Sequence, residues 1–368
     1  MNWKKILEES VQPQLPKKRD FRIASVGAGY IVAENQQVAY EKNGFHTYAI
    51  TSRRRENAQK VADRFGIPHV YDTADEMLED PNVEIVDIAV PPHVQAEVLH
   101  KCVEQRAHIK GVLCQKPGAV SLEQLRALNA VCKDSGIKVA VNHNMRYDQS
   151  MRALKCSLDR GLLGKPVIAS IDMRARADIQ PFFRQYGRLD ILDMGIHHID
   201  TLRWLFGMPQ KITSVCRTNP HLDYDHRDGI ARYVFQYEDG LVAEGLDDNF
   251  SGPFEPCEQD LYIKWRVEGT EGVAMGAIGW PYHPKLVPST FRITSSKIPG
   301  GWLTPEWETT WFPDAFAGTM ASLMRAVENK EDPEISLFDH ENTMACVEAC
   351  YRSIEEERTV YLKEIERK

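Results

Sequence analysis

Short apolar runs alternate with helical patterns through the first 145 residues of this 368-residue chain. The runs that we expect to be strands are 21–26, 47–51, 84–90, 109–114 and 138–141. Strands that alternate with helices in this way are typical of parallel βαβ units. The pattern therefore predicts a doubly wound parallel sheet for residues 1–145, in which residues 1–20 are an extension that packs on, or hangs off, the first strand.

After residue 146 the pattern changes to longer extended runs. The expected strands are 167–175, 211–216, 230–237, 241–246, 260–267 and 290–295. One helix is expected within this series, at 191–206, and two more near 315–329 and 339–357. Because 368 residues exceed one ordinary core, the sequence predicts a second α/β domain over 146–368, with a large, open, mostly antiparallel sheet.

The composition excludes several classes of partner. Hydrophobic residues at 43% and charged residues at 27% are those of a globular protein, and the net charge of −8 argues against a nucleic-acid surface. No apolar run reaches the ~20 residues of a membrane span, and the charged N-terminus does not resemble a signal peptide. Eight scattered cysteines without a CxxC pair indicate free thiols in a reducing cytoplasm and no metal site.

A glycine turn, Gly27-Ala28-Gly29, follows the first expected strand. Gly27 permits a tight turn, and Gly29 lets the backbone approach a pyrophosphate at the start of the helix that opens with Tyr30 and Ile31. A glycine pair alone is weak evidence, but a strand before it and a helix after it predict a dinucleotide-binding Rossmann domain.

The tip of the second expected strand, Ser52-Arg53-Arg54, bears on the choice of cofactor. An NAD site usually has an acidic side chain here, but no Asp or Glu stands between Gly44 and Arg55. A hydroxyl and guanidinium groups instead suit a 2′-phosphate, which favours NADP(H) over NAD(H). The alternative is that these arginines form a solvated helix start.

Gln115-Lys116-Pro117 ends another expected strand, beside the cofactor crevice. A lysine there can donate to a substrate oxygen and to the nicotinamide ribose, and proline fixes the turn that aims it. An ordinary Lys-Pro turn is the alternative interpretation.

Asp193-Met194-Gly195-Ile196-His197 carries the second half of the predicted chemistry. A spacing of four places Asp193 and His197 on one helical face, where the carboxylate can hold the imidazole or a substrate hydroxyl. His197 can take the proton of a carbinol or give one to a carbonyl, and Gly195 leaves room for substrate. A structural histidine is the alternative.

Further polar residues are candidate substrate contacts. Arg146 and Tyr147 follow the last strand of the first domain and are expected to reach the crevice. Arg174, Arg176 and Arg184 precede the Asp193 helix and fit either substrate contacts or salt bridges.

In their order and spacing these motifs resemble the glucose–fructose oxidoreductase/inositol dehydrogenase (Gfo/Idh/MocA) family. The family's EKP motif matches 115–117, its DxGxHxxD motif matches 193–200, and segments 267–272 and 312–316 are also similar. The resemblance begins near Phe21 and implies a Rossmann domain followed by an α/β domain whose open sheet often builds homo-oligomers. It also implies that Lys116, Asp193 and His197 form the catalytic set.

Two positions depart from the family pattern. Gln115 replaces the glutamate of EKP, and Gln95 stands where the family often has histidine. The cofactor contacts expected in these regions are Pro91, His93, Gln95, Gln115, Lys116 and Asn144.

The leading functional prediction is an NAD(P)-dependent oxidoreductase that transfers a hydride between nicotinamide and a carbon of a sugar, glycoside or polyol. His197 shuttles the proton and Lys116 polarises the oxygen. Two alternatives remain: a glycoside-cleaving enzyme whose bound NAD(P) is recycled through transient C3 oxidation, and a non-enzymatic cofactor-binding regulator.

Overall fold

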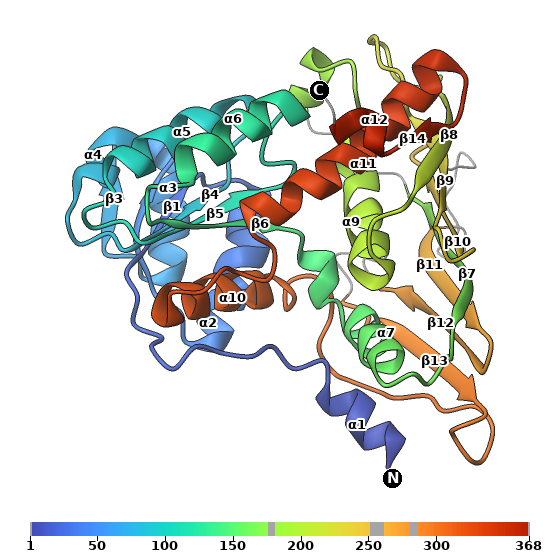
Figure 1. The fold of residues 1–368 in the computed structure, drawn as a ribbon. Helices are drawn as coiled ribbons and strands as arrows, with labels where there is room; N and C mark the ends of the chain where they lie inside the picture. The colour runs from blue at the N-terminus through green and yellow to red at the C-terminus, as the bar shows by residue number, and fades with distance from the viewer. Residues whose placement is uncertain (1, 176–180, 251–260, 280–285, 367–368) are drawn as a thin grey trace. The chain divides into compact units, whose positions relative to one another are not determined.

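The computed structural model describes residues 2–175, 181–250, 261–279 and 286–366 (Figure 1). The chain forms two compact units, and neither is continuous in sequence. Unit 1 contains residues 1–12, 145–311 and 342–368, and unit 2 contains residues 13–144 and 312–341.

Unit 2 is built on a six-stranded parallel sheet in the order β3-β2-β1-β4-β5-β6. Its strands are β1 (Ile23–Val26), β2 (Thr47–Thr51), β3 (His69–Tyr71), β4 (Ile85–Ile88), β5 (Gly111–Gln115) and β6 (Lys138–Asn142). This order confirms the predicted doubly wound Rossmann sheet. The strand order reverses beside β1, and a crevice for a dinucleotide lies at the carboxyl ends of the strands at such a point.

Helices cover both faces of this sheet. They are η1 (Val32–Gln36, a π-helix), α2 (Gln37–Asn43), α3 (Arg55–Phe65), α4 (Ala74–Glu79), α5 (Pro92–Glu104), α6 (Leu122–Cys132) and α10 (Phe316–Asn329). Figure 1 shows α5 and α6 on one face and α2 and α10 on the other. Phe316, Met320 and Leu323 of α10 are part of the apolar core of unit 2. The sequence-based division had assigned α10 to the second domain.

Unit 1 is built on an eight-stranded sheet in the order β13-β12-β11-β7-β10-β9-β8-β14. Its strands are β7 (Pro166–Arg174), β8 (Lys211–Arg217), β9 (Ile230–Gln236), β10 (Val242–Asp248), β11 (Tyr262–Gly269), β12 (Gly272–Ile278), β13 (Thr290–Ser295) and β14 (Val360–Tyr361). Only the described pair β7–β10 runs parallel, which confirms the prediction of a mostly antiparallel sheet.

Helices of unit 1 pack on its sheet or on one another. They are α1 (Trp3–Glu9), α7 (Gln149–Asp159), α8 (Asp190–Asp193), α9 (Gly195–Phe206) and α12 (Lys363–Glu366), with short 3-10 turns at Asn144–Tyr147 and Pro181–Gln185. Helix α9 contacts β10, and α7 contacts β12 and β13. The long helix α11 (Leu337–Glu356) begins in unit 2 and continues in unit 1.

The N-terminal extension differs from its expected position on the first strand. Helix α1 packs on α7 of unit 1, where Leu7 is fully buried and Glu8 accepts the backbone N–H of Glu306. Residues 13–20 belong to unit 2, where Glu328 accepts the backbone N–H groups of Lys17 and Lys18. The extension therefore packs on both units and is not an appendage of β1 alone.

Among the described residues, no helix combines the length and apolar composition needed to cross a membrane. The described cysteines are free thiols, and Cys257 lies outside the described residues.

Candidate functional site

The glycine turn after β1 has the two properties that a pyrophosphate site requires. Gly27 has a φ of +121°, and a Cβ atom there would lie 2.4 Å from the carbonyl oxygen of Ala89, so no other residue fits. A Cβ atom on Gly29 would meet no described atom within 4 Å. The space over Gly29 is therefore open, and the backbone there can approach a ligand closely. These residues fit a dinucleotide.

The turn also joins three strands at their carboxyl ends. Gly27 donates its N–H to Thr51 O at the end of β2 at 2.8 Å, and Ala89 donates to Val26 O at 2.8 Å. A helical turn begins at Tyr30 and Ile31, directly after Gly29. The first N–H groups of a helix have no partner within the helix, so they are available to an anion.

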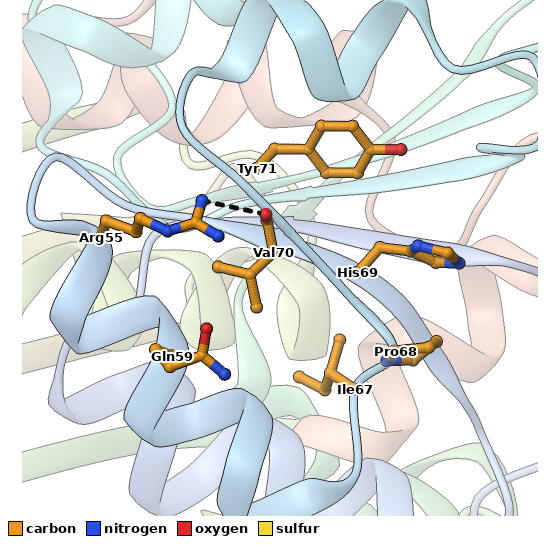
Figure 2. A pocket seen from close by; sticks show the side chains of 7 residues that line it. All are labelled: Arg55, Gln59, Ile67, Pro68, His69, Val70 and Tyr71. Atoms are coloured by element: carbon orange, nitrogen blue, oxygen red, sulfur yellow. Dashed lines mark hydrogen bonds between the residues drawn. The ribbon is translucent and has the colours of Figure 1, made fainter.

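The basic segment after β2 divides into two parts. Ser52 is half-buried, and Arg53 and Arg54 are exposed. The guanidinium of Arg55 is engaged elsewhere, because its Nη1 donates to Asp72 Oδ1 at 2.7 Å and to Val70 O at 3.1 Å. Figure 2 shows this contact of Arg55 with the edge strand β3. The structure therefore leaves Ser52, Arg53 and Arg54 as the candidates for recognising the adenosine ribose.

An open cavity of about 450 Å³ lies along α3 and β3 (Figure 2). Its lining residues are Arg55, Gln59, Ile67, Pro68, His69, Val70 and Tyr71. None of them is a candidate catalytic or cofactor-binding residue, so the cavity is not part of the candidate site.

The loop after β4 leads directly into α5. Pro91 is the N-cap residue of α5, and His93 is exposed in its first turn. Gln95 is buried, and its Nε2 donates to Val90 O at 3.0 Å. Gln95 therefore holds the loop that carries Pro91 and His93, and its contact with the cofactor stays a prediction.

Lys116 follows β5 at the same edge of the sheet as the glycine turn. Gln115 ends β5 and is half-buried beside Asn142 of β6, its partner in register. Gly118, with a φ of +73°, donates its N–H to Gln115 O at 2.9 Å and closes the turn around Lys116. The lysine side chain is half-buried, so a substrate oxygen that it contacts would be partly removed from water.

In unit 1 the predicted helix 191–206 is two helices. Asp193 is the last residue of α8, and His197 is in the first turn of α9. Met194 separates the two helices. Asp193 is half-buried, and His197 is 4% exposed. The His197 ring stands perpendicular to the ring of Trp311, at a centroid distance of 6.1 Å. The sequence reasoning did not single out Trp311, because nothing local links it to a residue 114 positions earlier.

Gly195 has a different function from the one expected. A Cβ atom at Gly195 would lie 2.6 Å from Oδ2 of Asp247 in β10, so the carboxylate occupies the place expected for substrate. Oδ1 of the same carboxylate is 2.5 Å from Nδ1 of the buried His198. The glycine lets Asp247 approach α9 and fix the residue next to His197.

A layer of buried acids supports α8. Asp228 accepts the backbone N–H groups of Leu189 and Ile191 at 2.9 and 2.7 Å, and burial raises its pKa to about 6. Asp190 accepts Nδ2 of Asn249 at 2.5 Å, and burial followed by the charge of Asp247 raises the pKa of Asp190 well above its ordinary value. Asp190 is the first residue of α8, the helix that ends with Asp193.

Arg146 and Tyr147, which were expected to contact substrate, are both buried and have contacts within the protein. Both guanidinium nitrogens Nε and Nη2 of Arg146 donate to Asp200 at 2.6 Å, and the arginine is 2% exposed. Tyr147 is buried under the guanidinium of Arg152, 4.0 Å from its ring centroid. The pair Arg146–Asp200 holds the turn before α7 against α9, and contact of Arg146 or Tyr147 with substrate stays a prediction. Asn144, in the same turn, is also buried.

The other arginines before α8 are explained in part by ion pairs. Arg174 contacts Asp248 at 3.1 Å and Asp172 at 3.5 Å, and Arg184 contacts Asp223 at 3.3 Å. Arg176 lies outside the described residues.

The structure thus gathers the predicted residues in two groups. In unit 2, the glycine turn, the Ser52–Arg54 segment, Pro91 and Lys116 follow strands that end at one edge of the parallel sheet. In unit 1, Asp193 and His197 flank the junction of α8 and α9. The first group can hold a dinucleotide and offer an ammonium group, and the second offers a carboxylate and an imidazole for proton transfer.

Family models match both parts of the chain. The Gfo/Idh/MocA model described as "Oxidoreductase family, NAD-binding Rossmann fold" matches residues 21–143. The model described as "Oxidoreductase family, C-terminal alpha/beta domain" matches residues 158–362.

Curated relatives match over most of their length. The chain is 26% identical over 358 residues to D-apiose dehydrogenase from Paraburkholderia graminis, which covers 94% of this chain and 91% of the relative. It is 23% identical over 346 residues to myo-inositol 2-dehydrogenase from Thermotoga maritima. This match covers 94% of this chain and 99% of the relative.

Solved structures share the fold. An oxidoreductase from Agrobacterium radiobacter in complex with NAD+, L-tartaric acid and magnesium has a TM-score of 0.79 at 23% identity, over 94% of this chain and 99% of that chain. Levoglucosan dehydrogenase in complex with NADH and levoglucosan has a TM-score of 0.78 at 18% identity, over 93% of this chain and 99% of that chain.

Proposed function

This chain belongs to the Gfo/Idh/MocA family of NAD-binding oxidoreductases, and on that premise we propose that it oxidises or reduces a sugar, glycoside or polyol. The names of the relatives, D-apiose dehydrogenase and myo-inositol 2-dehydrogenase, support this class of substrate. One observation carries the proposal: the lysine turn and the glycine turn follow strands of one parallel sheet at the same edge. This edge is where Rossmann domains bind their cofactor.

In the proposed reaction each residue has one task. When bound, a nicotinamide cofactor would supply the hydride chemistry. The ammonium group of Lys116 donates a hydrogen bond to the substrate oxygen and stabilises the negative charge that develops on it. His197 takes the proton of the carbinol during oxidation and returns it to the oxygen during reduction. Asp193 orients the substrate hydroxyl or the imidazole.

The catalytic assignment is tested by Lys116→Ala and His197→Ala in an assay of NAD(P)H absorbance over a panel of sugars and polyols. We expect kcat to fall about 10²- to 10⁴-fold in either variant, the contribution of a positioned acid–base group, while the cofactor still binds. Lys110→Ala is the control, because Lys110 is exposed and its Nζ donates to the carbonyl oxygen of the nearby Ala107. Unchanged turnover in either active-site variant would refute the assigned roles.

We further propose that the cofactor is NADP(H), with the 2′-phosphate bound by Ser52, Arg53 and Arg54. Fluorescence titration with NADPH and NADH measures the preference directly. We expect the double variant Arg53→Ala/Arg54→Ala to lose about 10-fold or more in NADPH affinity with little effect on NADH, since each charge-assisted hydrogen bond contributes about 1.5–3 kcal/mol. Arg55→Ala is the matched control, because Arg55 is bound to Asp72. Equal affinities in the wild type would contradict this preference.

Cofactor that copurifies and does not exchange would instead support the recycling glycoside-cleaving mechanism.

The open face of the unit 1 sheet is the proposed surface for homo-oligomers. It exposes Ile168 of β7, Val215 of β8 and Val242 of β10, with Val215 64% exposed. Apolar side chains that recur on one sheet face are typical of an interface between proteins.

A further inference from the structure

Two buried histidines lie directly beneath the lysine turn of unit 2. His143 follows β6, and His340 lies in the first turn of α11; both are fully buried. Nε2 of His143 is 2.9 Å from Nδ1 of His340, and Nε2 of His340 is 2.7 Å from the carbonyl oxygen of Pro117. The two rings therefore connect the end of β6 to the residue that follows Lys116.

The direction of one of these hydrogen bonds is fixed by chemistry. A carbonyl oxygen only accepts, so Nε2 of His340 carries a hydrogen and donates it to Pro117. When the His340 ring is neutral, its Nδ1 has a lone pair and accepts the Nε2–H of His143. The contact with Pro117 stays the same in either protonation state of the ring.

Two hydrogen bonds hold the lysine turn, one on each side of Lys116. Pro117 has no N–H to donate. Gly118 N–H donates to Gln115 O on one side of Lys116, and His340 donates to Pro117 O on the other. The position of His340 is itself fixed, because Ser336 Oγ accepts the N–H of Asp339 and Ser336 O accepts the N–H of His340.

We propose that His340 is a positioning residue for Lys116. By holding the carbonyl of Pro117, it sets the direction in which the lysine side chain leaves the turn, and His143 aligns the His340 ring. The catalytic consequence rests on the proposed function of Lys116. The mechanical consequence, a turn kept closed by His340, does not.

A pair of amide substitutions separates the two hydrogen bonds of His340. The side-chain nitrogen of glutamine reaches about as far as Nε2 of histidine, and that of asparagine about as far as Nδ1. His340→Gln therefore keeps the donor to Pro117 O, and His340→Asn loses it. We expect kcat to be retained in His340→Gln and to fall about 10-fold in His340→Asn, the factor that corresponds to one lost hydrogen bond. The affinity for the cofactor should change little in either variant.

Hydrogen exchange provides a readout that does not depend on catalysis. The Gly118 amide closes the lysine turn, so peptides that contain residue 118 report its opening. We expect exchange there to accelerate about 10-fold in His340→Asn and to remain unchanged in His340→Gln. The control is His226→Asn, which alters a buried histidine of unit 1 that contacts Asn219 N and Tyr224 O. This control should leave exchange at residue 118 unchanged.

The outcomes distinguish the positioning role from the proposed function. Faster exchange in His340→Asn but not in His340→Gln supports the positioning role, even if Lys116→Ala remains active and the proposed function fails. Equal exchange in both variants overturns it, as does a loss of kcat in both with a common fall in Tm. If His340→Asn does not fold, His143→Leu replaces it. That variant removes only the alignment of the His340 ring and should accelerate exchange at residue 118 by a smaller factor, and unchanged exchange would overturn the proposal.

Discussion

At the scale of single residues, the two glycines of the first turn have different reasons to be glycine. Gly27 combines a positive φ with a carbonyl 2.4 Å from any Cβ, so the fold itself excludes a side chain. Gly29 has neither constraint, because no described atom lies within 4 Å of a Cβ there. The fold therefore leaves room for a side chain at Gly29, and we propose that a ligand is the reason for glycine there.

Alanine substitution should separate these two reasons. We expect Gly27→Ala to lower the stability of the protein by about 1–3 kcal/mol, since the added methyl group is overpacked and the backbone is strained. Gly29→Ala should leave Tm within about 1 °C and weaken NADPH binding, because the methyl group fills the space where a pyrophosphate would approach. Calorimetry and fluorescence titration measure the two effects. A Gly29→Ala protein that binds cofactor with wild-type affinity would contradict the assignment of the pyrophosphate to this turn.

At the scale of elements, β4 and the first helix of unit 2 share a buried carboxyl group. Asp87 of β4 accepts Tyr40 Oη at 2.6 Å and Gln36 Nε2 at 2.9 Å. Burial raises the pKa of Asp87 to about 6, against which the two hydrogen bonds act. Because the folded state binds this proton more tightly than the unfolded chain, the stabilisation is complete below pH 4 and is lost as the pH rises toward 6.

Asp87→Asn should remove this pH dependence. The loss in the wild type is about 3 kcal/mol at most, so the variant should have a higher Tm than the wild type at pH 7.5 and a similar Tm at about pH 3.5, below the pKa of the unfolded chain. Gln36 can turn its amide and accept the new N–H, since its Oε1 has no partner among the described atoms. Calorimetry of both proteins at the two pH values measures the difference. Asp80→Asn is the control of opposite sign, because hydrogen bonds from Asn82 and Tyr71 lower the pKa of Asp80 to about 2. A constant Tm difference for Asp87→Asn would show that residue 87 does not titrate in this range.

Much of this element structure could be predicted, because local periodicity carries it. The strands expected at 47–51 and 290–295 agree with the structure to the residue. The sequence did not reveal β3 or β12, since the first has three residues and the second alternates glycine and alanine with larger side chains. It predicted a helix that opens with Tyr30 and Ile31, but not that Val32–Gln36 within it is a π-helix.

Short sequence motifs indicated the candidate residues of the site. They did not indicate the residues that pack against them, which come from distant parts of the sequence. Lys116, Asp193 and His197 stand within short motifs, so their types and spacing could indicate chemistry. Their supports come from distant segments: Asp247 beneath Gly195, Trp311 beside His197, and His340 on Pro117. No spacing in the sequence predicts such pairs, because tertiary packing brings them together.

At the scale of the whole molecule, the chain does not divide once, at residue 145, as its sequence suggested. Residues 312–341 return to unit 2, where α10 packs on β5 and β6. Gly111 of β5 shows how closely they pack, because a Cβ there would lie 2.8 Å from a methyl group of Val327. The first residues of the chain are likewise shared, with 1–12 in unit 1 and the segment from 13 in unit 2.

This division predicts that two nearby leucines stabilise different units. Leu7 is fully buried in unit 1, and Leu15 packs against the core of unit 2. We expect Leu7→Ala to cost about 2–5 kcal/mol and to accelerate hydrogen exchange in α7 while leaving β1 and α10 unchanged. Leu15→Ala is the matched control and should have the opposite pattern, with a smaller effect because Leu15 is only partly buried. Exchange mass spectrometry of the intact protein resolves both patterns. If Leu7→Ala accelerated exchange in β1 and α10 as strongly as in α7, the two units would unfold together. Leu7 would then stabilise the molecule as a whole, and the assignment of the N-terminal helix to unit 1 would fail.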